Sequence, residues 1–165
     1  EIYKNLSDSD DEVVIEYNSS QIKFNINNLE IISKLIDGKF PDFNRVIPKN
    51  NTKQIVLNRI NFLQSLQRTA ILSNEKFRGV QLEVYENKMF IMCNNSEQEE
   101  AYEEIEITYN DEKINIGFNI NYLSDVIANL NTDYIHLNLN DNHSSALITI
   151  AEDTEFKYVV MPLRM

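Results

Sequence analysis

The sequence predicts an α+β fold in which helices pack on antiparallel sheets in repeated helix-plus-strands units. A helical apolar stripe supports the main helix, predicted at residues 58–72, and it consists of Ile60, Leu63, Leu66 and Ile71 with Phe62. Paired strand-like runs joined by turns predict three hairpins, at residues 13–26, 80–93 and 134–150. Each hairpin follows a predicted helix and precedes one further strand, so the same unit occurs three times.

The other elements complete this order along the chain. Predicted helical segments are the end of a helix at residues 1–6 and a second full helix at residues 121–130. Predicted strands are residues 13–17, 22–26, 29–35, 79–85, 88–93, 104–109, 114–118, 134–139 and 146–150, with a last strand from Tyr158. Polar or turn-rich segments are predicted at residues 7–11 and 37–43, and a linker at residues 49–52.

The repeat predicts two domains. If a complete domain holds two units, residues 53–165 form one whole domain. Residues 1–52 then form about half of another, which the resemblance described below implies to be its C-terminal half. Because the chain begins at Glu1 without an initiator Met, we expect it to be a fragment of a longer protein.

Composition indicates a globular protein from a reducing compartment. Apolar residues make up 42% of the 165 residues, and only three Gly and three Pro occur. The single Cys93 excludes an intramolecular disulfide, so we expect a cytoplasmic protein and a buried, structural thiol. The sequence contains neither a signal peptide nor an apolar run long enough for a membrane span, so no membrane association is expected.

Charge is distributed unevenly. The net charge is −11, yet residues 44–74 contain five cations and no acid, so the remainder carries −11 − 5 = −16. A basic segment in an acidic protein can attract a polyanion locally. A chance gap in the acids is the alternative explanation.

The last eight residues, 158–165, are nearly all apolar and include one cation, Arg164. Tyr158, Val159 and Val160 favour a strand, and Pro162 ends it because it has no N–H to donate. Two interpretations remain open from these residues alone. The segment is either the last strand of a β core or one wall of a peptide-binding groove, for which flexible side chains such as Met161 are suited.

No catalytic or metal-binding motif emerges. His136 and His143 share no metal-ligand spacing with a Cys or carboxylate, and Cys93 has no motif around it. The sequence also lacks a phosphate-binding loop, a Gly-x-Ser-x-Gly elbow and a dinucleotide fingerprint. We therefore expect a protein without catalytic activity, cofactor or metal.

Several segments together resemble the bacterial sliding-clamp family, the beta subunit of DNA polymerase III. They are residues 34–43 with 45–48, 70–80, 94–101, 117–119 with Tyr122 and Leu123, and 158–162. The resemblance implies the DNA-clamp fold, with the end of the second clamp domain followed by the third. It implies a non-catalytic processivity factor for the replicative polymerase. In this family two three-domain protomers close into a ring around duplex DNA, so without a first domain the chain is not expected to encircle DNA.

The resemblance also implies three surfaces. A groove between the second and third domains docks linear motifs of polymerase III alpha, clamp-loader subunits, other polymerases and repair proteins. The residues that match this groove are Pro41, Val46, Asn119, Tyr122, Ser145, Val159, Met161, Pro162, Leu163 and Arg164. At His143 the family more often has an apolar residue. Part of the second-domain wall is expected to precede Glu1.

The second implied surface faces DNA, and the third closes a homodimer. Candidate DNA-facing cations are Arg45, Lys49, Lys53, Arg59, Arg68 and Arg78. Candidate dimer-interface residues are Ile71, Leu72, Glu97, Glu99, Glu100 and Glu103, which would meet a basic edge of the partner's first domain. From the residues alone, each cation could be a solvated side chain, and the acidic run from Glu97 to Glu104 could be a solvated loop.

Two alternative functions are weighed against the clamp. One is a β-rich scaffold that binds peptides without a DNA role. The other is a metal- or carboxylate-dependent enzyme, for which no constellation of residues argues.

Overall fold

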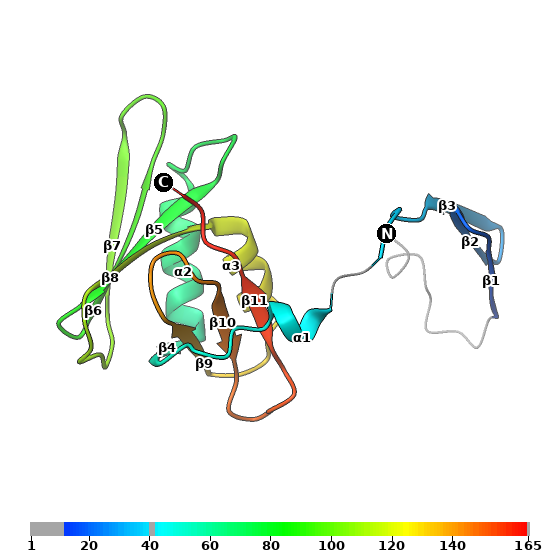
Figure 1. Ribbon diagram of the computed structural model, residues 1–165. Coiled ribbons are helices and arrows are strands. Elements are labelled where there is room, and N and C mark those ends of the chain that lie inside the picture. Colours follow the sequence, from blue (N-terminus) through cyan, green and yellow to red (C-terminus); the bar gives the residue numbers. More distant parts are fainter. Residues whose placement is uncertain (1–11, 40–41, 165) are drawn as a thin grey trace. The chain divides into compact units, whose positions relative to one another are not determined.

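The computed structural model describes residues 12–39 and 42–164, and the chain divides into two compact units, Glu1–Asp42 and Phe43–Met165 (Figure 1). This division lies N-terminal to the boundary expected between residues 52 and 53. The segment at residues 49–52, expected to be a linker, is attached to the second unit through Asn51. Its Nδ2 donates to the carbonyl of Asn138 at 2.8 Å and to that of Ser145 at 3.1 Å.

The first unit contains a three-stranded antiparallel sheet, sheet A, with strand order β1-β2-β3. Its strands are β1 (Val13–Tyr17), β2 (Gln21–Ile26) and β3 (Leu29–Lys34), which confirms all three predicted here. Asn18 shapes the first turn, because its Oδ1 accepts from the backbone N–H groups of Ser20 and Gln21, both at 2.8 Å. The predicted helix end at residues 1–6 and polar turn at residues 7–11 lie outside the described residues.

The second unit begins with a short helix, α1 (Phe43–Val46), which was not predicted and which starts at the last residue of the turn-rich segment expected at residues 37–43. Ten further elements follow. In chain order they are β4 (Lys53–Asn58), α2 (Arg59–Ala70), β5 (Gly79–Tyr85), β6 (Lys88–Asn94), β7 (Glu100–Glu106), β8 (Ile114–Asn119), α3 (Ile120–Ala128), β9 (Tyr134–Leu139), β10 (Ala146–Thr149) and β11 (Tyr158–Val160).

These ten elements are two copies of a strand-helix-three-strand unit that exchange their first strands. Sheet B has the order β11-β10-β9-β4, and sheet C has the order β7-β6-β5-β8, both antiparallel. Strand β4 belongs to the first copy but pairs with β9 of the second, and β8 belongs to the second copy but pairs with β5 of the first. The predicted α+β fold with helix-plus-strands units is confirmed, and each unit has a leading strand in addition. Strand β8 was predicted at residues 114–118, whereas β4 was not predicted.

Strand β4 was missed because it runs into α2 without a turn. Asn58 is both the last residue of β4 and the N-cap of α2, where its Oδ1 accepts from the Asn61 N–H at 3.0 Å. Asn119 has the same double position between β8 and α3, and its Oδ1 accepts from the Asn121 N–H at 3.0 Å. An asparagine that ends a strand and starts a helix leaves no Gly or Pro to mark the boundary.

Strand β7 also differs from its prediction. It was predicted at residues 104–109 and lies at Glu100–Glu106. Most of the acidic run is therefore on a strand rather than in a loop. Its side chains alternate between exposed and half-buried positions, because successive residues of a strand point to opposite faces.

The core lies between the helices and the two sheets, and the face of α2 that enters it is partly the one predicted, since Phe62 and Leu66 are buried and Leu63 packs against the core. The buried residues of α2 are Phe62, Ser65, Leu66 and Thr69. Ile60 and Ile71, which were assigned to the buried stripe, are 43% and 80% exposed. Two polar residues fit on the buried face because Thr69 Oγ1 donates within the helix, with the Ser65 and Leu66 carbonyls at 2.9 and 3.1 Å.

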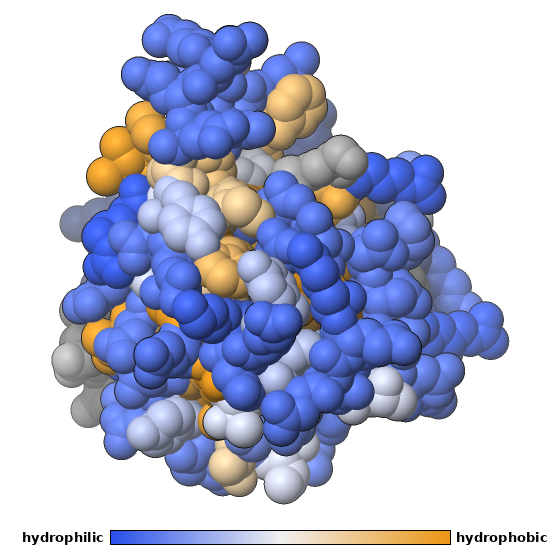
Figure 2. All heavy atoms as spheres, turned by 90° about the vertical axis from the view of Figure 1, so that its left-hand side faces the viewer, coloured by the Kyte–Doolittle hydropathy of each residue, from blue (hydrophilic) through white to orange (hydrophobic). Residues whose placement is uncertain are grey.

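Helix α3 packs beside α2 and buries Ile120, Leu123, Val126 and Ile127 (Figure 1). The face in Figure 2 is mostly hydrophilic, with apolar side chains scattered among polar ones. Within residues 12–39 and 42–164, no helix combines the length and apolar character that a membrane crossing requires.

The corrected face of α2 generates a prediction about stability. Phe62→Ala should lower the free energy of unfolding of the second unit by about 3–5 kcal/mol, because it leaves a cavity in the core. Ile60→Ala should cost about 1 kcal/mol or less, since Ile60 is largely exposed. Urea unfolding followed by circular dichroism checks both variants. Equal losses would contradict this orientation of the helix.

Candidate functional site

The C-terminal segment connects the edges of the two sheets. Strand β11 forms one edge of sheet B, where Val160 pairs with Ala146 of β10. The chain then leaves sheet B, and the Leu163 N–H donates to the carbonyl of Gly117 at 2.8 Å. Gly117 lies on β8, which is an edge strand of sheet C. The expected last strand is confirmed, and the residues after it span from one sheet to the other.

Met161 lies between the two edges. One step beyond the β10–β11 ladder, Ser145 is the position opposite Met161. Continuing the Gly117–Leu163 pairing by two residues places Asn119 opposite Met161 on the other side. The Met161 side chain is 71% exposed, whereas its neighbours Val159 and Pro162 are half-buried. The flexible thioether side chain of Met161 is therefore exposed between the edges of two sheets.

Helix α3 contributes one anchoring group and one exposed ring to the same region. Asn119 caps α3, and its Nδ2 also donates to the Phe77 carbonyl at 3.4 Å. Tyr122 lies in the first turn of α3 with its side chain 56% exposed, and α3 contacts β11. Asn119 thus fixes the helix start, while Tyr122 is free to contact a ligand.

Two hollows flank Leu163 and Arg164. The first, of about 360 Å³, is also lined by Gln81, Asn115, Gly117, Asn142 and His143. The second, of about 320 Å³, is also lined by Asn74, Phe77, Gly79 and Asn94. The Asp141 carboxylate orders the loop around the first hollow, because it accepts from the backbone N–H groups of His143 and Ser144. These bonds lower the pKa of Asp141.

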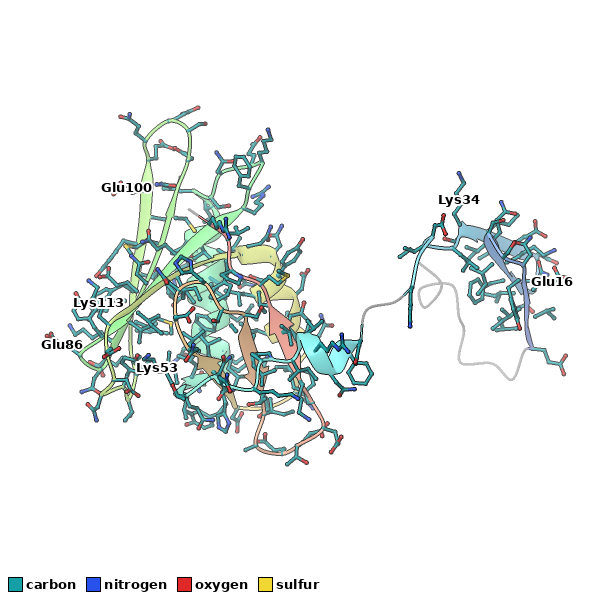
Figure 3. All side chains as sticks on the ribbon, in the orientation of Figure 1. Glu16, Lys34, Lys53, Glu86, Glu100 and Lys113 are labelled. Atoms are coloured by element: carbon teal, nitrogen blue, oxygen red, sulfur yellow. The ribbon has the colours of Figure 1, made fainter. Side chains whose placement is uncertain are left out.

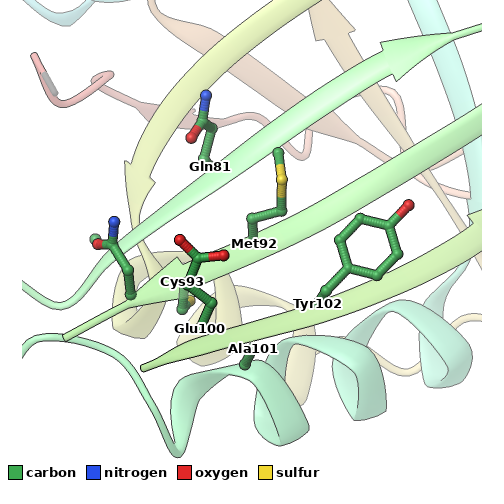
Figure 4. Close-up of a pocket in the computed structure, with 8 residues that line it drawn as sticks. Gln81, Met92, Cys93, Glu100, Ala101 and Tyr102 are labelled. Atoms are coloured by element: carbon green, nitrogen blue, oxygen red, sulfur yellow. The ribbon is translucent and has the colours of Figure 1, made fainter. Parts of the chain in front are cut away.

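A third hollow lies on the outer face of sheet C (Figure 4). Its lining includes Gln81, Met92, Glu100 and Tyr102, and it shares Gly79 and Asn94 with the second hollow. Next to it, the Phe90 ring packs between Tyr85 and Tyr102, with ring centroids 5.1 and 5.5 Å apart. No role was predicted from the sequence for this face of sheet C. The feature that could have indicated it is the unbroken apolar run in β6, because such a run is typical of a strand that is buried on both faces.

Among the six candidate DNA-facing cations, those that donate to protein groups include Lys53, Arg59, Arg68 and Arg78. Lys53 Nζ donates to the Asn140 carbonyl at 2.9 Å (Figure 3). The Arg59 guanidinium donates to the Thr132 and Ile127 carbonyls at 2.6 and 3.3 Å. The Arg68 guanidinium forms a two-bond pair with the Glu103 carboxylate, at 2.7 and 2.8 Å.

Arg45, Lys49 and Arg78 are placed as follows. Arg45 lies in α1, and Lys49 follows it on an exposed stretch. Arg78 is half-buried, adopts a positive φ of 47°, and lies 3.4 Å from the Ser73 hydroxyl. Arg59 and Arg68 are nine residues apart, two and a half helical turns, so α2 directs them to opposite sides.

The candidate interface residues gather at one edge of sheet C. Strand β7 is the edge strand there and carries Glu100 and Glu103. Glu97 and Glu99 lie in the preceding turn, where Asn95 Oδ1 accepts from both of their backbone N–H groups. Ile71, the C-cap residue of α2, is 80% exposed, and Leu72 is half-buried. Helix α2 contacts β7, so one exposed apolar side chain accompanies an acidic strand edge.

Groups that could carry other chemistry are placed as follows. Cys93 is buried, and burial raises the pKa of its thiol. His136 lies on β9 and His143 in the β9–β10 loop. No cluster of three His, Cys, Asp or Glu side chains suited to a metal ion occurs within the part of the chain that the structure describes. Pro41 lies outside that part, and Val46 is exposed on α1.

Comparison with known proteins identifies the family. Residues 44–164 match the family model of the DNA polymerase III beta subunit, C-terminal domain, and residues 1–42 match that of its central domain. The chain belongs to the DNA polymerase III beta subunit family. The two matches meet where the structure divides into its two units.

Individual relatives of this family match the whole chain. It is 41% identical to the beta sliding clamps of Pseudomonas aeruginosa and Escherichia coli, and 39% identical to that of Vibrio cholerae. All three matches cover 100% of this chain, and the chain spans about 45% of the length of these relatives.

Solved clamp structures share the fold. The crystal structure of the Pseudomonas aeruginosa DNA polymerase III subunit beta aligns with a TM-score of 0.80 at 41% identity, covering 98% of this chain and 45% of that one. The crystal structure of the C. crescentus beta sliding clamp aligns with a TM-score of 0.76 at 35% identity, covering 93% of this chain and 41% of that one. The DNA-clamp fold expected from the sequence is confirmed.

The role of Arg59 in this beta-subunit domain was not expected and generates a prediction. Because its guanidinium donates to the Ile127 carbonyl near the end of α3 and to the Thr132 carbonyl in the loop behind it, Arg59→Met should lower the free energy of unfolding by about 1–2 kcal/mol. Lys49→Met, on an exposed stretch, is the control and should change stability little. Thermal unfolding of both variants decides. A loss no larger than the control's would mean that the carbonyl contacts contribute nothing.

Proposed function

We propose that this chain acts as part of a ring-shaped sliding clamp, a processivity factor that keeps the replicative DNA polymerase on duplex DNA. The observation that carries the proposal is the family match over the whole chain, with two successive clamp domains in order. The clamp is a non-catalytic subunit, and it needs no cofactor for this task. A peptide-binding scaffold without a DNA role is not favoured, because the matched relatives are named beta sliding clamps.

The groove that docks polymerases, the clamp loader and repair proteins is proposed to centre on Met161. Three features support this: the exposed thioether between two sheet edges, the Tyr122 ring on α3, and the hollows beside Leu163 and Arg164. A short linear motif gains affinity by placing a few apolar side chains in such pockets. A Pseudomonas aeruginosa clamp has been solved with griselimycin bound, so a member of this family takes a ligand.

The DNA-facing surface is proposed to include the exposed side of α2. That side carries neutral amides, Asn61, Gln64 and Gln67, rather than a row of free cations. Uncharged amides and a few mobile cations contact phosphates without holding one position, which suits a ring that slides. Lys49 is a candidate for such a contact because it is exposed, whereas Lys53, Arg59, Arg68 and Arg78 donate to protein groups.

Ring closure is proposed to use the β7 edge. Exposed Ile71 supplies an apolar contact, and Glu97, Glu99, Glu100 and Glu103 supply a negative edge for a basic partner strand. Acidic side chains along a free edge also prevent pairing with unsuitable strands. The edge is therefore selective for a positively charged partner.

The groove proposal predicts peptide binding by this chain. Calorimetric titration with a Gln-Leu-x-Leu-Phe-type peptide should give micromolar affinity, and Met161→Ala should weaken it about tenfold because an exposed anchor contact is lost. Met92→Ala, a methionine outside the groove, is the matched control and should bind normally. Equal affinity of the two variants would remove Met161 from the groove.

The DNA proposal predicts a change in salt dependence. The test protein is a chimera in which this chain replaces its matching residues in the Pseudomonas aeruginosa beta sliding clamp. Lys49→Gln should reduce the slope of log affinity against log salt by about one, equally on different duplex sequences. Lys113→Gln is the control, since Lys113 pairs with Glu83 and contacts the Tyr85 ring on sheet C. An unchanged slope in the Lys49 variant would exclude a phosphate contact there.

A further inference from the structure

The Arg68–Glu103 pair joins residues that the sequence assigned to two different surfaces. Arg68 was a candidate DNA contact on α2, and Glu103 a candidate interface residue on β7. Arg68 Nε donates to Glu103 Oε1 at 2.7 Å, and Arg68 Nη2 donates to Glu103 Oε2 at 2.8 Å. This fork geometry matches a guanidinium to both oxygens of one carboxylate, so it fixes the orientation of the carboxylate as well as its distance.

A buried hydroxyl completes the arrangement. Arg68 Nη2 also lies 3.1 Å from Ser65 Oγ, and Ser65 Oγ lies 3.4 Å from Glu103 Oε2. Ser65 is only 1% exposed, one turn before Arg68 on α2, so it is a rigid part of the helix-to-core contact. Both oxygens of Glu103 are thereby tied to α2. The pair lowers the pKa of Glu103, which keeps the carboxylate charged.

The pair borders a polar cavity beside the free edge of β7. The cavity, of about 500 Å³, is lined on the helix side by Asn58, Asn61, Gln64, Ser65 and Arg68. On the strand side it is lined by Glu103, Glu104, Ile105 and Glu106. Because β7 is an edge strand, a strand added to it would place alternate side chains at the mouth of this cavity.

We propose that Arg68 is a positioning residue for ring closure: it orients Glu103 at the β7 edge for a basic side chain of the incoming strand, and it does not contact DNA phosphates. This assignment rests on the proposed clamp function. Each oxygen of a carboxylate has two acceptor sites, so Glu103 can keep its bonds to Arg68 and still accept from a partner's Arg or Lys. Arg68 thereby holds the carboxylate in place before the partner arrives, which reduces the ordering cost of association.

The test uses the chimera with the Pseudomonas aeruginosa clamp and measures dimer dissociation by analytical ultracentrifugation. Arg68→Gln should weaken association about tenfold, since the carboxylate loses its fixed orientation. Arg68→Lys should recover only part of the loss, because an ammonium cannot form the two-bond fork. Arg68→Gln combined with Glu103→Gln should be no weaker than Glu103→Gln alone, since Arg68 acts only through that carboxylate.

Two further measurements distinguish a positioning role of Arg68 from a general loss of structure and from a contact with DNA. The exchanged pair, Arg68→Glu with Glu103→Arg, should restore thermal stability but not association, because the charge offered to the partner is reversed. The salt slope of DNA binding, measured at concentrations where the chimera is dimeric, should not change in Arg68→Gln. In this chain alone, carbon-13 titration should show the Glu103 pKa rising towards its ordinary value in Arg68→Gln.

The results that overturn the proposal are distinct. A dimer unaffected by Arg68→Gln would overturn the positioning role. A salt slope reduced by about one with association intact would return Arg68 to the DNA surface. An additive loss in the double variant would show that Arg68 acts on the partner independently of Glu103. A chimera that stays monomeric with Arg68 intact would overturn the ring-closing function itself, and this assignment with it.

Discussion

The exchange of first strands between the two structural copies is the constraint on which the second unit depends. Strand β4 precedes α2 in sequence but completes sheet B, and β8 precedes α3 but sits in sheet C. Each brings buried apolar residues to the other copy's sheet, Ile55 and Leu57 from β4 and Ile116 and Phe118 from β8. Neither copy can therefore close its own core, and the two must fold together. The paired residues are also far apart in sequence, as Lys53 and Leu139 are. The chain therefore loses loop-closure entropy before the contacts between these strands can stabilise it.

This exchange also decides where the functional surfaces lie. It makes β8 an edge strand, and that edge is the one the C-terminal segment reaches when Leu163 bonds to Gly117. The opposite edge of the same sheet is β7, which has no strand beyond it among the described residues. One edge of sheet C therefore serves the proposed groove, and the other serves the proposed ring closure. The strands between them hold the two sites at a fixed separation.

The sequence was sufficient for the elements whose signals are local. The α2 and α3 helices, the three hairpins and the final strand follow from periodicity and turn residues, and each is present where it falls within the described residues. Strand β4 and the start of β7 escaped because no turn residue marks them and because an acidic run has the composition of a loop. Phe62 and Leu66 on the buried face of α2 were predicted correctly, but Ser65 and Thr69 were not expected there. Polar residues are accepted at such positions only through hydrogen bonds that the tertiary structure and the helix itself supply. For the site, the resemblance located residues, but it could not show that Asn119 caps a helix or that Lys53, Arg59 and Arg68 already have partners.

Arg59 and Arg68 show that the hydrogen bonds of a cation do not determine how much it contributes to the electrostatic field around the protein. Arg59 donates to neutral carbonyls, so its hydrogen bonds are used within the protein, and no carboxylate among the described residues forms an ion pair with it. Arg68 is paired with the Glu103 carboxylate, which accepts its hydrogen bonds and largely neutralises its positive charge. Arg59 can therefore still attract a polyanion over several ångströms without touching a phosphate, whereas Arg68 contributes little to attraction at that distance. A diffuse field of this kind, with few direct ion pairs, suits the proposed clamp function, because it attracts a polyanion to a surface without fixing it at one position.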